Sequence, residues 1–115
     1  SANEANVDAY MADPLCGGDT TLGLFRDMLD GLSIITKQSN INKMDKELPV
    51  FFIAGDKDPV GDMGKGVEKA YHCFQKAGLR DVSMKLYHDL RHEILNENGK
   101  QYVYRDVLDW LEARS

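Results

Sequence analysis

The segment VFFIAG, from Val50 to Gly55, constrains the fold more than any other part of this sequence. It follows Pro49 and holds five consecutive apolar residues, rich in branched and aromatic side chains, before the glycine ends it. A strand with one face in water alternates polar and apolar side chains, whereas a strand of a parallel sheet is covered on both faces and stays apolar throughout. The segment therefore predicts a buried strand of a parallel sheet.

A helix, a second strand and a last helix are predicted after it. Four apolar residues share helical spacing beyond the first strand: Val67, Ala70, Tyr71 and Phe74. Gly78 then stands where a glycine commonly ends a helix. The segment DVSMKLYH, residues 81–88, is the second strand candidate. The last helical stripe comprises Val103, Val107, Trp110 and Leu111.

The N-terminal third is predicted to hold one helix between two loops. Residues 22–36 carry apolar side chains at helical spacing, most simply explained as core packing, and Thr20 or Thr21 can cap this helix. The first 21 residues have the turn-rich composition of a loop, with at most a short helix near Val7 to Met11. The polar segment 37–48 is predicted to be a connecting loop.

This order of elements predicts an α/β fold: a helix, then β-α-β-α with two parallel strands joined by a right-handed crossover. Two parallel strands leave edges and faces that three helices cover only in part, and a parallel sheet this small is rarely stable alone. We therefore expect the sheet to be incomplete in this chain, which would be the C-terminal part of a larger protein.

Composition argues against several other classes of protein. The net charge is −5 and no run of Lys or Arg offers a stripe to phosphates, so no nucleic-acid partner is expected. No apolar run approaches the ~20 residues that span a bilayer, and the polar, acidic start SANEANVDAYMADP lacks the features of a signal peptide. Cys16 and Cys73 are 57 residues apart without CxxC spacing, which fits reduced thiols. These features predict a cytoplasmic location.

Asp58 and His92 are the candidate catalytic residues. Each lies just past one of the two predicted strands, and loops at the carboxyl ends of adjacent parallel strands share one edge of an open α/β sheet. The aspartate would hold one ring nitrogen of the histidine, and the other nitrogen would act as general base toward a hydroxyl or water. The competing interpretation makes Asp58 a turn former and His92 a helix cap.

Other patterns nearby predict neither a metal nor a cofactor. The segment HEILN begins like the zinc motif HExxH, but Asn96 stands where the second histidine is required. The segment GDMGKG lacks the spacing of a phosphate loop. His88 could line the same edge as His92 but belongs to no motif. Glu93 and Glu97 are expected to be first-turn acids, favoured by a helix dipole.

The arrangement of these segments resembles the C-terminal third of the α/β-hydrolase fold. The similarity extends from Leu48 to Leu111 and is to the lysophospholipase, monoacylglycerol lipase and serine aminopeptidase-like group. The segments that carry it are PVFFIAGDKDPVG, AGLRDVSMKLY, RHEILNE and VLDWL. The resemblance continues more loosely through DPLCGGDTTLGLFRDMLDGL, which looks like the stretch that joins the family's cap region to its late strands. It implies a loop or the end of a cap region at 1–21 and the C-terminal part of a hydrolase domain at 22–115.

The resemblance also implies roles for particular residues. The family's strand-end pattern G-x-x-D-P-V places the triad acid at Asp58, and its R-H-E places the triad base at His92. Asp56 occupies a variable position of the pattern and is not assigned the role. The family's nucleophile lies upstream in a G-x-S-x-G turn. None of this chain's serines lies in such a turn: Ser1, Ser33, Ser39, Ser83 and Ser115.

The implied function is that of a serine hydrolase that cleaves carboxylic esters. This chain would supply two residues of the catalytic triad and would be inactive alone. Small-molecule acyl esters, with glycerol- or phospho-linked acyl lipids favoured, are the expected substrates, and part of the stripe at 22–36 could line an acyl pocket. An aminopeptidase would share the same residues. The non-catalytic alternative is a binding or assembly module that pairs an exposed strand edge with another copy. The expected partners are thus the missing N-terminal part and a second copy of the chain.

Overall fold

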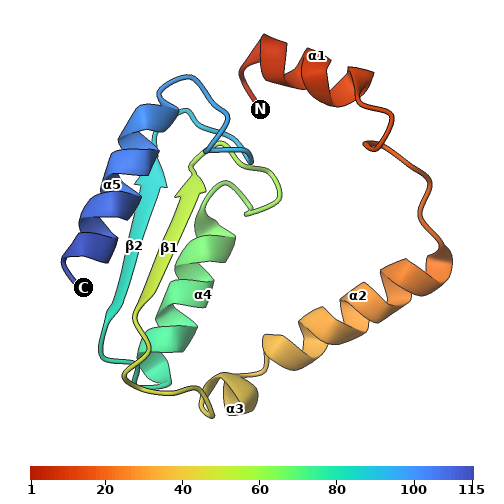
Figure 1. Cartoon of the computed structure of the whole chain (residues 1–115). Helices are drawn as coiled ribbons and strands as arrows, with labels where there is room; N and C mark the ends of the chain where they lie inside the picture. The colour runs from red at the N-terminus through yellow and green to blue at the C-terminus, as the bar shows by residue number, and fades with distance from the viewer.

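The computed structural model describes residues 1–115 and is a mixed α/β structure (Figure 1). Its elements, in chain order, are α1 (Glu4–Ala12), α2 (Leu22–Ile35), α3 (Gln38–Ile41), β1 (Val50–Gly55), α4 (Lys65–Lys76), β2 (Val82–Tyr87) and α5 (Lys100–Glu112). The predicted α/β fold class is confirmed, including the helix that precedes a β-α-β-α order.

The two strands form one parallel sheet. Val50 pairs with Val82 at its start, and Gly55 pairs with Tyr87 at its end. Both strands therefore finish at the same edge of the sheet. This is the edge at which the sequence places Asp58 and His92.

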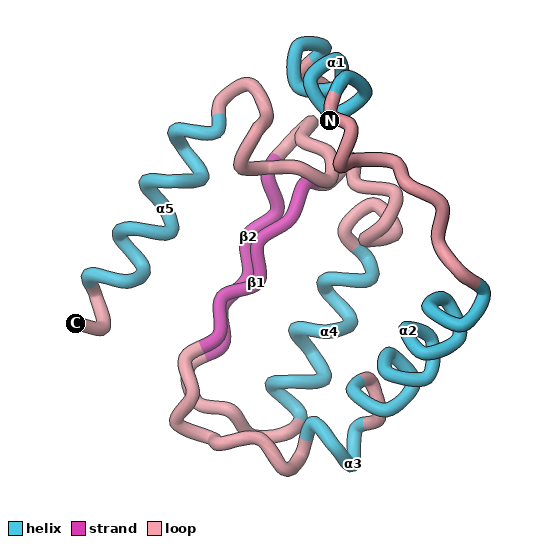
Figure 2. Tube along the Cα trace, turned by 45° about the vertical axis from the view of Figure 1, so that its right-hand side comes forward, coloured by secondary structure: helices cyan, strands magenta, loops and turns pink.

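Helices cover both faces of the sheet, as the unbroken apolar run of β1 predicts. Figure 2 shows α4 and α5 on opposite sides of the strands. Successive side chains of β1 point to opposite faces: Phe51 stacks on Trp110 of α5 with ring centroids 5.7 Å apart, whereas Phe52 meets Phe74 of α4 edge to face at 5.0 Å. The core between β2 and α5 contains Tyr87, Ile94 and Val103.

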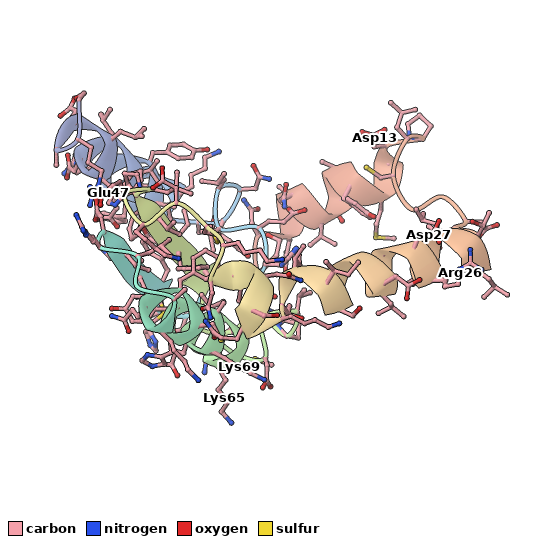
Figure 3. All side chains as sticks on the ribbon, turned by 90° about the horizontal axis from the view of Figure 1, so that it is seen from below. Asp13, Arg26, Asp27, Glu47, Lys65 and Lys69 are labelled. Atoms are coloured by element: carbon pink, nitrogen blue, oxygen red, sulfur yellow. The ribbon has the colours of Figure 1, made fainter.

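The N-terminal helices lie away from the sheet. α2 begins where predicted, and the Thr21 hydroxyl caps it by accepting the Leu24 N–H at 3.1 Å. Among the helices and strands, α2 contacts only α3. Figure 3 shows Arg26 and Asp27 near the end of α2 that is far from the strands. No residue of α2 is buried, so the prediction that its apolar stripe packs into the core is wrong within these residues.

Two further predictions for this region need correction. α1 is longer than the helix expected near Val7 to Met11, because it begins at Glu4, an acidic residue that the helix dipole favours in a first turn. The segment 37–48, predicted to be a loop, contains the single turn of α3, where Ile41 is buried. Polar composition hid this turn because Ile41 is its one large apolar residue.

The molecule has a small core for its length. Only 10 of 115 residues are buried. The radius of gyration is 16.4 Å, larger than the ~13 Å typical of a compact domain of about 100 residues. None of the helices is long and apolar enough to cross a membrane.

Candidate active site

The site lies where the loops after β1 and β2 meet. Backbone hydrogen bonds join them: the Asp56 N–H donates to the Tyr87 carbonyl and the Lys57 N–H donates to the Leu90 carbonyl, both at 3.0 Å. Gly55 is the point of closest approach, because a Cβ atom there would overlap the Leu90 carbonyl. The absence of a side chain at the end of β1 thus lets the second loop lie directly against the first.

Asp58 and His92, the two predicted catalytic residues, meet across these loops. Asp58 Oδ2 lies 3.0 Å from His92 Nδ1, and Asp58 Oδ1 accepts the Val60 N–H at 2.9 Å. Asp58 is buried at 6% exposure. His92 sits in a bend and begins no helix, so the interpretation of His92 as a helix cap is wrong.

The electrostatics of the pair leave the other ring nitrogen available. Burial raises the pKa of Asp58, but the hydrogen bonds from His92 and the Val60 amide outweigh burial and lower the pKa below its ordinary value. Asp58 is therefore an ionised acceptor at neutral pH, and the proton of the shared bond belongs to His92 Nδ1. In the neutral ring, Nε2 then carries the lone pair, on a side chain that is 61% exposed.

A second aspartate–histidine pair lies at the same edge. Asp56 Oδ2 lies 2.8 Å from His88 Nδ1, and Asp56 Oδ1 accepts the Asp89 N–H at 2.8 Å. Neither Asp56 nor His88 is among the catalytic residues predicted from the sequence. The rule that paired Asp58 with His92 could have found this pair, because Asp56 and His88 also follow the two strands.

Asp56, His88 and Asp89 also bring three potential metal ligands together, with ligand atoms within 4.8 Å of one another. Both ring nitrogens of His88 already face carboxylates, at 2.8 Å from Asp56 and 3.2 Å from Asp89. The hydrogen bonds and ion pairs within this group therefore account for the geometry without an ion.

The prediction for Glu93 and Glu97 is wrong, because neither residue lies in the first turn of a helix. α5 begins only at Lys100. Both carboxylates contact the segment around the start of α1 instead: Asn6 Nδ2 donates to Glu93 Oε2, and the Ala2 N–H donates to Glu97.

The serines lie in ordinary structural positions. Ser33 donates to the Asp30 carbonyl within α2, and Ser83 lies in β2 with a buried hydroxyl that has no partner. Ser39, predicted to be in a loop, lies in the short helix α3. The one hydrogen bond of the His92 ring is to Asp58, so no serine hydroxyl is bonded to it.

A parallel sheet with an aspartate–histidine pair at its carboxyl edge is the arrangement expected of the late part of an α/β-hydrolase. Comparison with known families agrees. The model of the family described as serine aminopeptidase, S33 (Hydrolase_4), matches residues 1–99, and the chain belongs to this family. No curated protein matches the chain.

Two solved structures are similar to it. One is a highly thermostable carboxyl esterase from Bacillus coagulans in complex with glycerol, with 25% identity and a TM-score of 0.89, covering 97% of this chain and 37% of the esterase. The other is a monoacylglycerol lipase from Paleococcus ferrophilus, with 17% identity and a TM-score of 0.70, covering 98% of this chain and 41% of the lipase. The chain thus spans less than half the length of either structure.

Proposed function

We propose that this chain supplies the acid and the base of a serine hydrolase that cleaves carboxylic esters. The observation that carries the proposal is the 3.0 Å contact between buried Asp58 and His92, whose Nε2 is free and whose side chain faces solvent. In this proposal the nucleophilic serine comes from a part of the protein that precedes these 115 residues. The Asp58–His92 pair alone would not form an acyl-enzyme.

The reaction follows from the two ring nitrogens. Asp58 keeps the proton on Nδ1, so that Nε2 takes the proton of the serine hydroxyl as the serine oxygen attacks the ester carbonyl carbon. The protonated ring then gives this proton to the departing alcohol oxygen as the ester bond breaks. In the second half, Nε2 takes a proton from water and the hydroxide adds to the acyl carbon. The bond between the acyl carbon and the serine oxygen then breaks, the proton returns to the serine oxygen, and the carboxylic acid leaves. Asp58 stabilises the imidazolium that forms in each half.

Acyl esters of glycerol are the proposed substrate class. The similar carboxyl esterase was solved in complex with glycerol, the alcohol half of an acylglycerol. A lysophospholipid presents the same acyl–glycerol bond, so a lysophospholipase belongs to the same proposal. A peptidase is the second candidate, because the matching family is described as serine aminopeptidase. Monoacylglycerol and aminoacyl-nitroanilide hydrolysis, measured on the intact protein that carries this chain, separate the two.

Substitution of the two residues in that intact protein tests their roles. We expect His92→Ala to lower kcat by about 10⁶-fold and Asp58→Asn by roughly 10⁴-fold, as for other triads. The matched controls are His88→Ala and Asp56→Asn, which remove the second pair at the same edge and should leave most of the activity. A His92→Ala protein with near-native turnover would overturn the assignment.

A fluorophosphonate probe, which reacts with an activated serine, locates the nucleophile. We expect one adduct per molecule on the intact protein and none on residues 1–115 alone, by intact mass. An adduct on the isolated chain would mean that one of its own serines is activated, which contradicts a nucleophile outside it.

A further inference from the structure

Glu97 is the most buried charged residue of the chain, at 2% exposure. It is not part of the Asp58–His92 pair, and a carboxylate buried this deeply is costly unless it is bonded. An ionised carboxylate can accept about four hydrogen bonds. The carboxylate of Glu97 therefore needs hydrogen-bond donors that offset the free energy lost when it is removed from water.

The partner is the backbone just before α1. Both carboxylate oxygens accept the N–H of Ala2, Oε1 at 2.9 Å and Oε2 at 2.8 Å. Two more bonds join the same segments: Asn3 Nδ2 to the Asn96 carbonyl at 3.2 Å, and Asn6 Nδ2 to Glu93 Oε2. We call these contacts between residues 1–6 and 93–97 the N-terminal clasp.

The clasp holds the loop that carries His92. On its inner side, Ile94 anchors this loop in the core against Tyr87 and Val103. On its outer side, the clasp ties it to α1, which lies beyond the carboxyl ends of the two strands (Figure 1). A small hollow lined by Ala2, Lys57 and Arg91, among others, places the start of the chain beside neighbours of Asp58 and His92.

We propose that Glu97 is a positioning residue for His92, acting through the N-terminal clasp. The inference rests on the proposed function. The buried carboxylate bonds the His92 loop to the segment around the start of α1, and these bonds hold the outer side of the loop. Loss of the carboxylate frees this loop on one side, and the ring then turns away from Asp58. A displacement of about 1 Å in a catalytic group can lower turnover by roughly 10²-fold.

The test uses the intact protein with three variants. Glu97→Ala removes the acceptor, and Glu97→Gln keeps one acceptor oxygen at nearly the same volume. Ile41→Ala is the matched control, because it removes a buried side chain in α3, outside the clasp and outside the core cluster that holds the His92 loop. We expect Glu97→Ala to lower kcat by about 10- to 100-fold, with a smaller change in KM, and Glu97→Gln to restore most of the loss. Hydrogen exchange should increase in α1 for Glu97→Ala but stay slow in β1, and Ile41→Ala should leave the exchange of α1 unchanged.

Unchanged kcat in Glu97→Ala, with or without faster exchange in α1, would overturn the positioning role. Faster hydrogen exchange throughout the Glu97→Ala protein would also overturn it, because Glu97 would then only stabilise the fold. If Glu97→Ala does not fold, Asn6→Ala loosens the clasp from its other side, and the same readouts apply. A wild-type protein without esterase activity would instead refute the proposed function, and exchange in α1 would still report whether the clasp forms.

Discussion

At the scale of residues, the two aspartate–histidine pairs at the sheet edge have the same chemistry but different surroundings. His88 has a carboxylate beside each ring nitrogen, whereas His92 has one beside Nδ1 and none beside Nε2. Only His92 therefore keeps a nitrogen free to take a proton. Asp58 is also the more buried acid, with a side chain 9% exposed against 29% for Asp56. Less screening by water makes its interaction with a protonated ring stronger.

The second pair has its own measurable effect. The hydrogen bond to Asp56 and the charge of Asp89 raise the pKa of His88, and the bond to His88 lowers the pKa of Asp56. The contribution of His88 to stability is thus present below the ordinary histidine pKa, about 6.5, and is lost as the pH rises through its raised value. The contribution of Asp56 is lost as the pH falls through its lowered value, so the pair stabilises the loops most between about pH 4 and 6.5.

An NMR titration of the intact protein checks this prediction. We expect the His88 ring to titrate above its ordinary range in the wild type and to move toward that range in Asp56→Asn. The ring of His72 is the internal control, because it lies on α4 and its partner is Gln75. A His88 midpoint that is the same in both proteins would show that the pair does not form in solution.

At the scale of elements, the end of β1 depends on a missing side chain. We expect Gly55→Ala to lower the free energy of unfolding by about 1–3 kcal/mol or more, because the new methyl group meets backbone that cannot rotate away. The same change should lower kcat, since the displaced carbonyls of Leu90 and Arg91 directly precede His92. Urea unfolding and ester turnover measure the two effects.

Gly31 provides the matched control for this substitution. It lies inside α2, where an added Cβ would meet nothing within 4 Å. Gly31→Ala should therefore be neutral or stabilise by up to about 1 kcal/mol, because alanine is the better helix former. Equal effects of Gly31→Ala and Gly55→Ala would contradict the close approach at the end of β1.

These elements also show what the sequence could predict. The apolar run of β1 and the strand order predicted the parallel sheet, and the shared carboxyl edge predicted that Asp58 and His92 meet. Glu97 was missed because its partner lies 95 residues earlier in the chain, and no local spacing signals a contact with a backbone amide. The second pair was not predicted for another reason: Asp56 occupies a variable position of the family's pattern, and His88 belongs to no motif.

At the scale of the whole molecule, the chain exposes surface that a compact domain would bury. Eight large apolar residues of α2 are exposed: Leu22, Leu24, Phe25, Met28, Leu29, Leu32, Ile34 and Ile35. An apolar groove continues from the end of α2 past Ile41 to Phe74 of α4. Large exposed apolar surfaces are typical of sites that contact another protein, a membrane or a ligand. The proposed upstream part of the hydrolase is the segment that would cover them.

We therefore expect the isolated chain to associate in solution. Light scattering coupled to size exclusion should give a mass that exceeds that of a 12.9 kDa monomer and increases with concentration. Replacing Met28 and Leu32 with lysine, on the exposed stripe of α2, should reduce the association, whereas Lys65→Ala on α4 should not. A monomer at every concentration would contradict the expectation.

The form of the association separates the two functions that the sequence left open. An incomplete hydrolase exposes a surface shaped for its own missing segment, so its copies should form a broad range of sizes. An assembly module has a closed, self-complementary interface, and its copies should stop at one size, most often a dimer. Addition of the upstream part should dissociate the associated copies of an incomplete hydrolase, because it covers the surface through which they associate. It should leave a closed dimer intact, because the interface of that dimer is formed by the two copies themselves.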